Sequence, residues 1–350
     1  MRGMVSSLRP LALCFLVACG GSAPLRSRGS QLGGANDMNR DPDLRDEKLN
    51  GRHTQYPIVL HHGFNASPDN EWGFYKVKEA LEADGHVVYV SWVRPFGSVA
   101  DRTTDLAEIV YDALVDQWHP WDDPAPLDLK VNIIAHSMGG LDSRELISVL
   151  GYGDAVASLT TISTPHHGSA VADFALSVLP DHADKALNAL GKAFATTFTR
   201  ADLAADSDVR AALTSLAESS AADFNATHPD DPRVFYQSWA GISSVGGITI
   251  PGMYDACGGT APSASADKMN AQLVPMAAFV SHFADRGELL ANDGMATVES
   301  AKWGTFRGCI PADHLDEVGQ IKYNGTDPRT GFDHIRFYRN MAFDLAAAGY

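Results

Sequence analysis

The chain has 350 residues, of which 45% are hydrophobic and 20% are charged, and its formal net charge at pH 7 is −16. This length and apolar content are enough for one large α/β domain with its own core. The negative charge argues against nucleic acid as a partner, because nucleic-acid-binding surfaces are basic.

The N-terminus is predicted to be an export signal covering residues 1–19. Arg2 and Arg9 precede a short apolar run over 11–18, which is too short to cross a bilayer and is typical of a signal peptide. The run ends at Cys19 in a sequence that resembles the lipobox of bacterial lipoproteins, where the cysteine becomes the lipidated first residue.

Ordinary cleavage near Ala18 or Ala23 is the alternative to lipidation. We therefore expect an exported protein, lipid-anchored in the bacterial outer membrane or at the cell surface, or else secreted. Residues 20–52 are rich in glycine, serine, asparagine and charge, and are predicted to form a flexible tether.

Residues 53–350 are predicted to form the folded domain, because apolar strands and helical patterns alternate along them as in a doubly wound sheet. In chain order, strands are expected over 56–63, 86–92, 131–136 and 158–163, and helices over 75–84, 99–117 and 141–150. From about 170 to 225 the chain becomes alanine-rich and helical, which predicts a lid or cap insertion.

The segment Ala135-His136-Ser137-Met138-Gly139 is predicted to be a nucleophile elbow. The sharp turn between strand and helix leaves room only for small residues two places before and two places after the serine. Ala135 departs mildly from the usual glycine, and a serine on an ordinary strand-to-helix loop is the alternative.

The strand over 56–63 ends at His62-Gly63, followed by Phe64. The glycine lets backbone amides turn toward the serine. The amides of Phe64 and Met138 are predicted to stabilise the oxyanion of a tetrahedral intermediate, each contributing about 3 kcal/mol. His61 and His62 are expected to shape the turn by hydrogen bonds.

A serine nucleophile needs a base and an acid, in the chain order serine, acid, histidine. Asp293 in an Asp-Gly turn and His314 in acidic surroundings fit that order. Other residues are possible on the same grounds: His166, His167, His282 and His334 as the base, and Asp255, Asp285 and Asp313 as the acid.

These segments, with those at 161–169, 238–241 and 314–318, resemble the bacterial true lipases, the secreted triacylglycerol lipases of the pseudomonad type. The similarity runs from about residue 56 to the C-terminus. It implies an α/β-hydrolase fold, a mostly parallel sheet with helices on both faces and a helical lid or cap. It also implies Ser137 as nucleophile, Asp293 as acid and His314 as base.

The resemblance further implies a structural Ca²⁺ near the histidine loop, and no organic cofactor is expected. Asp316 would supply a carboxylate, and Gln320 and Asn324 their backbone carbonyls, which are the oxygen ligands that calcium prefers. Asp255 is the candidate second carboxylate, although the glycine-rich run at 245–248 departs from the family there. The alternative is that Asp316 is a solvated residue at a helix start.

Cys257 and Cys309 are predicted to form a disulfide, because Cys14 leaves with the signal and Cys19 is committed to lipid. In the chain-entropy model this bridge contributes about 4 kcal/mol. A disulfide is also found in part of the lipase family.

The predicted function is a triacylglycerol lipase that acts through an acyl-enzyme. Its expected partners are a lipid or ester substrate, a lipid–water interface that moves the lid, and a lipase-specific foldase as a further candidate. The alternatives are a carboxylesterase or polyester depolymerase on the same fold, with a fixed cap, or a non-catalytic lipid-tethered lipoprotein on a decayed hydrolase fold.

Overall fold

The structure is a computed structural model that describes residues 53–64, 73–118, 128–178, 208–249, 252–259, 261–282, 290–319 and 326–350. The predicted signal peptide and tether lie outside these ranges. So do four residues proposed from the sequence: Cys19, Asp285, Gln320 and Asn324.

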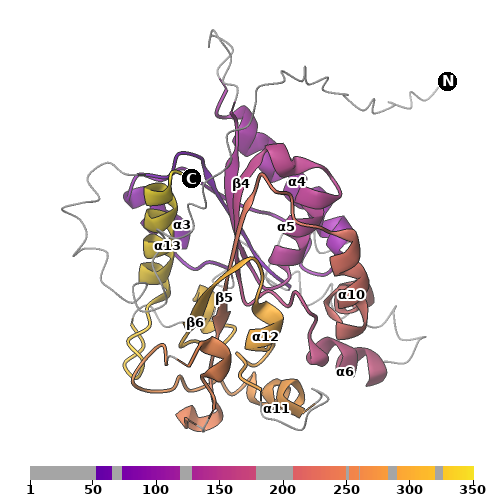
Figure 1. The fold of residues 1–350 in the computed structure, drawn as a ribbon, viewed down its shortest axis with the longest axis vertical. Coiled ribbons are helices and arrows are strands. Elements are labelled where there is room, and N and C mark those ends of the chain that lie inside the picture. Colours follow the sequence, from indigo (N-terminus) through magenta and orange to yellow (C-terminus); the bar gives the residue numbers. More distant parts are fainter. Residues whose placement is uncertain are drawn as a thin grey trace, which may run out of the picture.

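A six-stranded parallel sheet forms the centre of the domain, in the order β2-β1-β3-β4-β5-β6 (Figure 1). The strands are β1 (Ile58–His61), β2 (Val88–Val90), β3 (Val131–His136), β4 (Val156–Ile162), β5 (Phe235–Gly241) and β6 (Thr305–Ile310). The order of the strands reverses beside β1, so the loops leaving β1 and β3 meet at the topological switch point. Ligands bind at this point in open α/β sheets.

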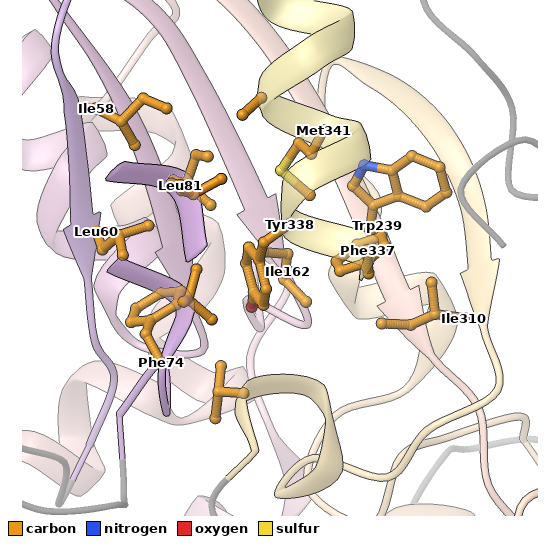
Figure 2. Close-up of a cluster of buried hydrophobic side chains, with 14 of the residues drawn as sticks. Ile58, Leu60, Phe74, Leu81, Ile162, Trp239, Ile310, Phe337, Tyr338 and Met341 are labelled. Carbon is orange, nitrogen blue, oxygen red and sulfur yellow. The ribbon is translucent and has the colours of Figure 1, made fainter. Parts of the chain in front are cut away.

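One face of the sheet is covered by α3 (Val77–Ala83) and α13 (His334–Ala348), as Figure 1 shows. Alternate strand residues point to this face, because successive side chains of a strand point to opposite sides. Figure 2 shows Ile58 and Leu60 on this face, and Phe337, Tyr338 and Met341 of α13 in the same buried cluster.

The opposite face carries α4 (Val99–Val115) and α5 (Gly139–Ser148). The other strand residues point to this face. Among them, Val59 and Ile133 pack against Leu106 and Val110 of α4. Helices therefore cover both faces, and the predicted fold class is confirmed.

The remaining helical elements are η3 (Tyr152–Asp154), α6 (Ala170–Val178), α9 (Val209–Leu216), α10 (Glu218–Thr227), η4 (Val245–Gly247), η5 (Asp255–Cys257), α11 (Val274–His282), α12 (Val298–Ala301) and η6 (Asp316–Val318). The described parts of the 170–225 insertion are helical, namely α6, α9 and most of α10. The predicted strand over 86–92 is shorter than expected, because β2 is an edge strand that pairs only with β1 over three residues.

The two ends of the described domain meet. The backbone N–H of Gln55, just before β1, donates to the carbonyl oxygen of Tyr350 at 2.7 Å. This contact lies at the edge where the parallel strands begin, whereas the loops at the switch point lie at the opposite edge. None of the helices that the structure describes is long and apolar enough to span a membrane.

Candidate active site

Ser137 lies in the sharp turn between β3 and α5, with a backbone φ of 55°. This left-handed conformation is uncommon for a residue with a side chain and marks local strain. A Cβ on Gly139 would lie 2.7 Å from the carbonyl oxygen of His61, so only glycine fits there. Ala135 is fully buried at the matching position before the serine. The local geometry is that of a nucleophile elbow.

Three side chains predicted from the sequence form one hydrogen-bonded chain. The Ser137 hydroxyl donates to His314 Nε2 at 2.9 Å, and His314 Nδ1 donates to Asp293 Oδ2 at 2.7 Å. The loops after β3 and β6 carry the first two residues, and the segment between α11 and α12 carries Asp293. The serine can therefore lose its proton to the imidazole, which the carboxylate orients.

Asp293 is held as a carboxylate by its surroundings. Its full burial alone would raise its pKa, but the nearby His314 ring and the backbone N–H groups of Ala296 and Met295 hold the pKa below its usual range. Those two N–H groups donate to Oδ1 at 2.7 and 2.8 Å, which leaves Oδ2 for the histidine. The carboxylate is thus ionised at neutral pH and fixed in orientation.

The backbone after β1 passes directly beside the serine. A Cβ on Gly63 would lie 2.6 Å from Ser137 Cβ and 3.1 Å from its Oγ, so a larger residue there would fill the site. Within the described ranges, no hydrogen bond uses the backbone N–H of Phe64 or of Met138. Both amides are available for a ligand beside Ser137 Oγ.

A buried polar network supports this backbone segment. Arg102 is fully buried, and its guanidinium donates to the carbonyl oxygen of His62 and to Asp142 Oδ2, both at 2.8 Å. His61 contacts the same Asp142 oxygen at 3.0 Å. Burial lowers the pKa of both His61 and His62, so these histidines are neutral and structural.

The rival histidines are engaged elsewhere. The His166 and His167 rings lie near Trp303, and His334 Nε2 contacts the carbonyl oxygen of Tyr75 at 2.9 Å. The His282 side chain lies outside the described part of the chain.

The rival acids also occupy other positions. Asp313 accepts hydrogen bonds from the backbone N–H groups of Asn270, Leu315 and Asp316. Asp255 is exposed in η5.

A cluster of three aspartates beside the histidine loop could hold a metal ion. Carboxylate oxygens of Asp267, Asp313 and Asp316 lie within 4.8 Å of one another. Burial, followed by repulsion from its acidic neighbours, raises the pKa of Asp316 to about 8, and burial raises that of Asp267 to about 7. A hard cation would offset this repulsion, and the oxygen donors suit one. Asp267 and Asp316 also line a cavity of about 230 Å³.

Asp255, which the sequence suggested as the second carboxylate, does not belong to this cluster, whereas Asp267 lies in it beside Asp316. The chain returns after η5 and pairs beside Ser244, whose N–H donates to the Asp267 carbonyl oxygen at 3.2 Å. The hydroxyl of Ser243 donates to Asp267 Oδ2 at 2.5 Å. These contacts fix Asp267 next to Asp316.

Cys257 and Cys309 are bonded in the structure, with their Cα atoms 5.5 Å apart. The bridge joins η5 to β6, the strand that leads to His314. It therefore restrains the segment that precedes the catalytic loop.

Two further residues next to the site were not considered as functional from the sequence. His136 Nε2 lies 3.0 Å from Glu317 Oε2, and the His136 ring centroid lies 4.5 Å from that of His314. Glu317 is fully buried, and this burial raises its pKa well above the usual range. Only their positions in the sequence could have indicated a role, since His136 directly precedes Ser137 and Glu317 follows His314 by three residues.

Comparison with known proteins gives matches along most of the chain. Residues 56–273 match the family described as the alpha/beta hydrolase fold. The chain is 28% identical to triacylglycerol lipase 2 of Saccharomyces cerevisiae, over 78% of this chain and 73% of the yeast protein. It is 29% identical to a triacylglycerol lipase of Pseudarthrobacter phenanthrenivorans, over 77% and 90% respectively.

Among solved structures, the fold is similar to that of a metagenomic carboxyl esterase. The TM-score is 0.61 at 15% identity, covering 93% of this chain and 96% of the esterase.

Proposed function

The chain belongs to the α/β-hydrolase fold family, and from this premise we propose that it is a triacylglycerol lipase, a serine ester hydrolase that cleaves acylglycerols. The observation that carries this proposal is the continuous hydrogen-bonded chain from Ser137 through His314 to Asp293 on a strained elbow. The acylglycerol substrate is inferred from the similarity to bacterial and yeast triacylglycerol lipases.

In the first half-reaction, Ser137 Oγ attacks the ester carbonyl carbon while its proton moves to His314 Nε2. The amides of Phe64 and Met138 stabilise the negative oxygen of the tetrahedral intermediate. When that intermediate collapses, the alcohol leaves with the proton from His314, and the acyl group stays on Ser137 as an ester.

Water completes the second half-reaction. It gives a proton to His314 and attacks the acyl-enzyme carbonyl, and collapse of the new intermediate returns that proton to Ser137 Oγ. The fatty acid is released. Asp293 stays ionised throughout and stabilises the imidazolium that forms twice in each cycle.

Labelling with a fluorophosphonate ester tests the chemistry, because this probe reacts only with an activated serine. We expect the wild-type protein to be labelled and Ser137→Ala to remain unlabelled. No labelling of correctly folded wild-type protein would favour a lipid-tethered protein without catalytic activity.

A chain-length series of emulsified triacylglycerols and soluble esters tests the substrate class. Hydrolysis of the emulsified long-chain esters is expected. Activity confined to soluble short esters would instead favour a carboxylesterase, and activity on polyester films a depolymerase.

We also propose that the aspartate cluster binds Ca²⁺ through Asp267 and Asp316. Asp313 is less suited as a ligand, because its carboxylate oxygens already accept three backbone N–H groups. When bound, the ion supplies a positive charge that fixes the loop carrying His314. The carbonyl groups of Gln320 and Asn324, outside the described residues, complete the expected ligand set.

For localisation, we propose export with lipid attachment at Cys19. Mass spectrometry of protein from the native host should show a diacylated cysteine as the mature N-terminus, and Cys19→Ser should release the protein from the membrane. An unmodified N-terminus beyond Ala23 would mean free secretion. A lipase-specific foldase is a candidate partner, and refolding of denatured protein without any helper would exclude that need.

A further inference from the structure

We propose that His136 and Glu317 are positioning residues that clamp the loop of the catalytic base to the nucleophile elbow. The inference rests on the proposed serine hydrolase function. His136 is the last residue of β3 and directly precedes Ser137, whereas Glu317 lies in η6, on the loop that carries His314. A contact between them therefore joins the nucleophile and the base independently of the substrate.

The His136 ring contacts the base loop at two points. Its Nε2 lies 3.0 Å from Glu317 Oε2, and its ring centroid lies 4.5 Å from that of His314. The loop that carries His314 has a further contact, in which the backbone N–H of His314 donates to the carbonyl oxygen of Asp293 at 3.0 Å.

The Glu317 carboxyl group also has a partner at the end of a neighbouring strand. One of its oxygens, Oε2, lies 3.0 Å from His136 Nε2. Its other oxygen, Oε1, accepts from the Ser163 hydroxyl at 2.6 Å. Ser163 Oγ in turn accepts from the backbone N–H of Gly241 at 2.9 Å. Both carboxyl oxygens of Glu317 therefore have polar partners, which is how buried polar networks are stabilised.

The ends of the neighbouring strands are shaped around this carboxyl group. A Cβ on Gly241, at the end of β5, would lie 1.8 Å from Glu317 Oε1, so a larger residue would displace the glutamate. Ser163, just after β4, has a positive φ of 47°. His136, Ser163 and Glu317 are all at most 3% exposed. The strained backbone of Ser163 and the close approach of Gly241 both occur around the Glu317 carboxyl group, which indicates that the fold is shaped to hold this side chain.

The key variant is Glu317→Gln, because an amide on a side chain of the same length can still bond both Ser163 and His136. We expect Glu317→Gln to keep kcat and the rate of fluorophosphonate labelling close to wild type. Glu317→Ala should lower both by about 10²-fold with little change in KM, since a displacement of about 1 Å at the base has that effect. All assays contain saturating calcium, so that the aspartate cluster does not vary.

His136→Ala tests the clamp from the nucleophile side and replaces Glu317→Ala if that variant fails to fold. It should lower kcat to a similar extent. The double variant should be little worse than either single one, because the two residues act as one unit.

Gln237→Ala is the matched control. Gln237 lies near the start of β5, away from Ser137, and its buried amide donates to Thr160 Oγ1 at 2.8 Å. The variant should lower the Tm and leave kcat unchanged, which separates positioning from general stability.

The clamp is overturned if Glu317→Gln loses as much activity as Glu317→Ala, because a side chain that can keep both contacts would then fail to hold the loop. It is also overturned if Glu317→Ala and His136→Ala are labelled as fast as wild type, or if Gln237→Ala loses kcat equally. Failure of the wild-type protein to react with the probe would refute the proposed function instead.

Discussion

Replacing Asp293 by asparagine tests the orientation of the catalytic histidine most directly. Oδ1 of this residue faces two backbone N–H groups, at 2.8 and 2.7 Å, so the oxygen of an asparagine must stay there. Its NH₂ group would then face His314 Nδ1, where the carboxylate oxygen now lies at 2.7 Å. The imidazole must accept that hydrogen bond and carry its proton on Nε2. In that tautomer it cannot take the proton of Ser137.

The expected loss of kcat for Asp293→Asn is about 10⁴-fold, which corresponds to about 5.5 kcal/mol in the barrier. Asp293→Ala leaves the histidine free to choose its tautomer and should lose no more than the asparagine variant. Burst kinetics with a soluble nitrophenyl ester measure acylation directly, with the melting curve as a check of folding. Asp84→Asn, at a distant ion pair with Arg339, is the control and should keep its activity. Retention of more than about a tenth of kcat by Asp293→Asn would refute the tautomer argument.

The other predictions concern the nucleophile, the metal, the disulfide and pH. Ser137→Ala should lower turnover by about 10⁴ to 10⁶-fold with an unchanged circular dichroism spectrum, and activity above a few per cent would exclude this nucleophile. A chelator should lower the Tm and added calcium should restore it, by about 2.7 kcal/mol of stability at a hundred times Kd, whereas Asp316→Asn should respond to neither. A melting curve of demonstrably metal-free wild-type protein that the chelator does not change would contradict the calcium site. Replacing Cys257 and Cys309 together by serine should lower the free energy of unfolding by about 4 kcal/mol, and an unchanged denaturant midpoint would argue against the bridge. The pKa of Asp293 is lowered in the folded state, so its ionised form stabilises the fold above the unfolded pKa of about 3.9, and this contribution is lost as the pH falls through the folded value. The stability difference between wild type and Asp293→Asn should therefore stay constant above about pH 5 and shrink as the pH falls below about 4, and a difference that stays constant in acid would contradict the assignment.

The elbow was predictable from the sequence because its cause is local. The strained backbone of Ser137 requires small residues two places before and two places after it, so the five consecutive residues 135–139 are enough to predict the turn. The positions of Asp293 and His314 followed from the order of the triad and from the similarity of short segments. Distance along the chain gave no information on the partner of Ser137, since the hydrogen bond from Ser137 to His314 spans 177 positions.

The second carboxylate of the aspartate cluster was not predictable in the same way. Asp255 and Asp267 both follow the glycine-rich run, and only the pairing of Ser244 with the segment at Asp267 decides between them. That pairing depends on tertiary contacts, which leave no periodic signal in so irregular a stretch.

Buried polar residues limited the prediction elsewhere. β5 carries Gln237 and Ser238 inside the sheet, which weakens its apolar pattern, although both side chains have partners in Thr160 and Trp303. Glu317 looked like a solvated residue at a helix start, yet it is fully buried. A sequence shows polarity but not the partners that make its burial tolerable.

The contact between Gln55 and Tyr350 determines how the enzyme would be oriented if it were immobilised on a solid support. Both ends of the domain leave from the edge where the strands begin, and Ser137 opens at the other edge. A bead or electrode coupled through either end would hold the molecule with its reactive serine directed away from the solid. The same geometry recommends this junction for circular permutation, because a short linker could join the two ends without crossing the path of the substrate.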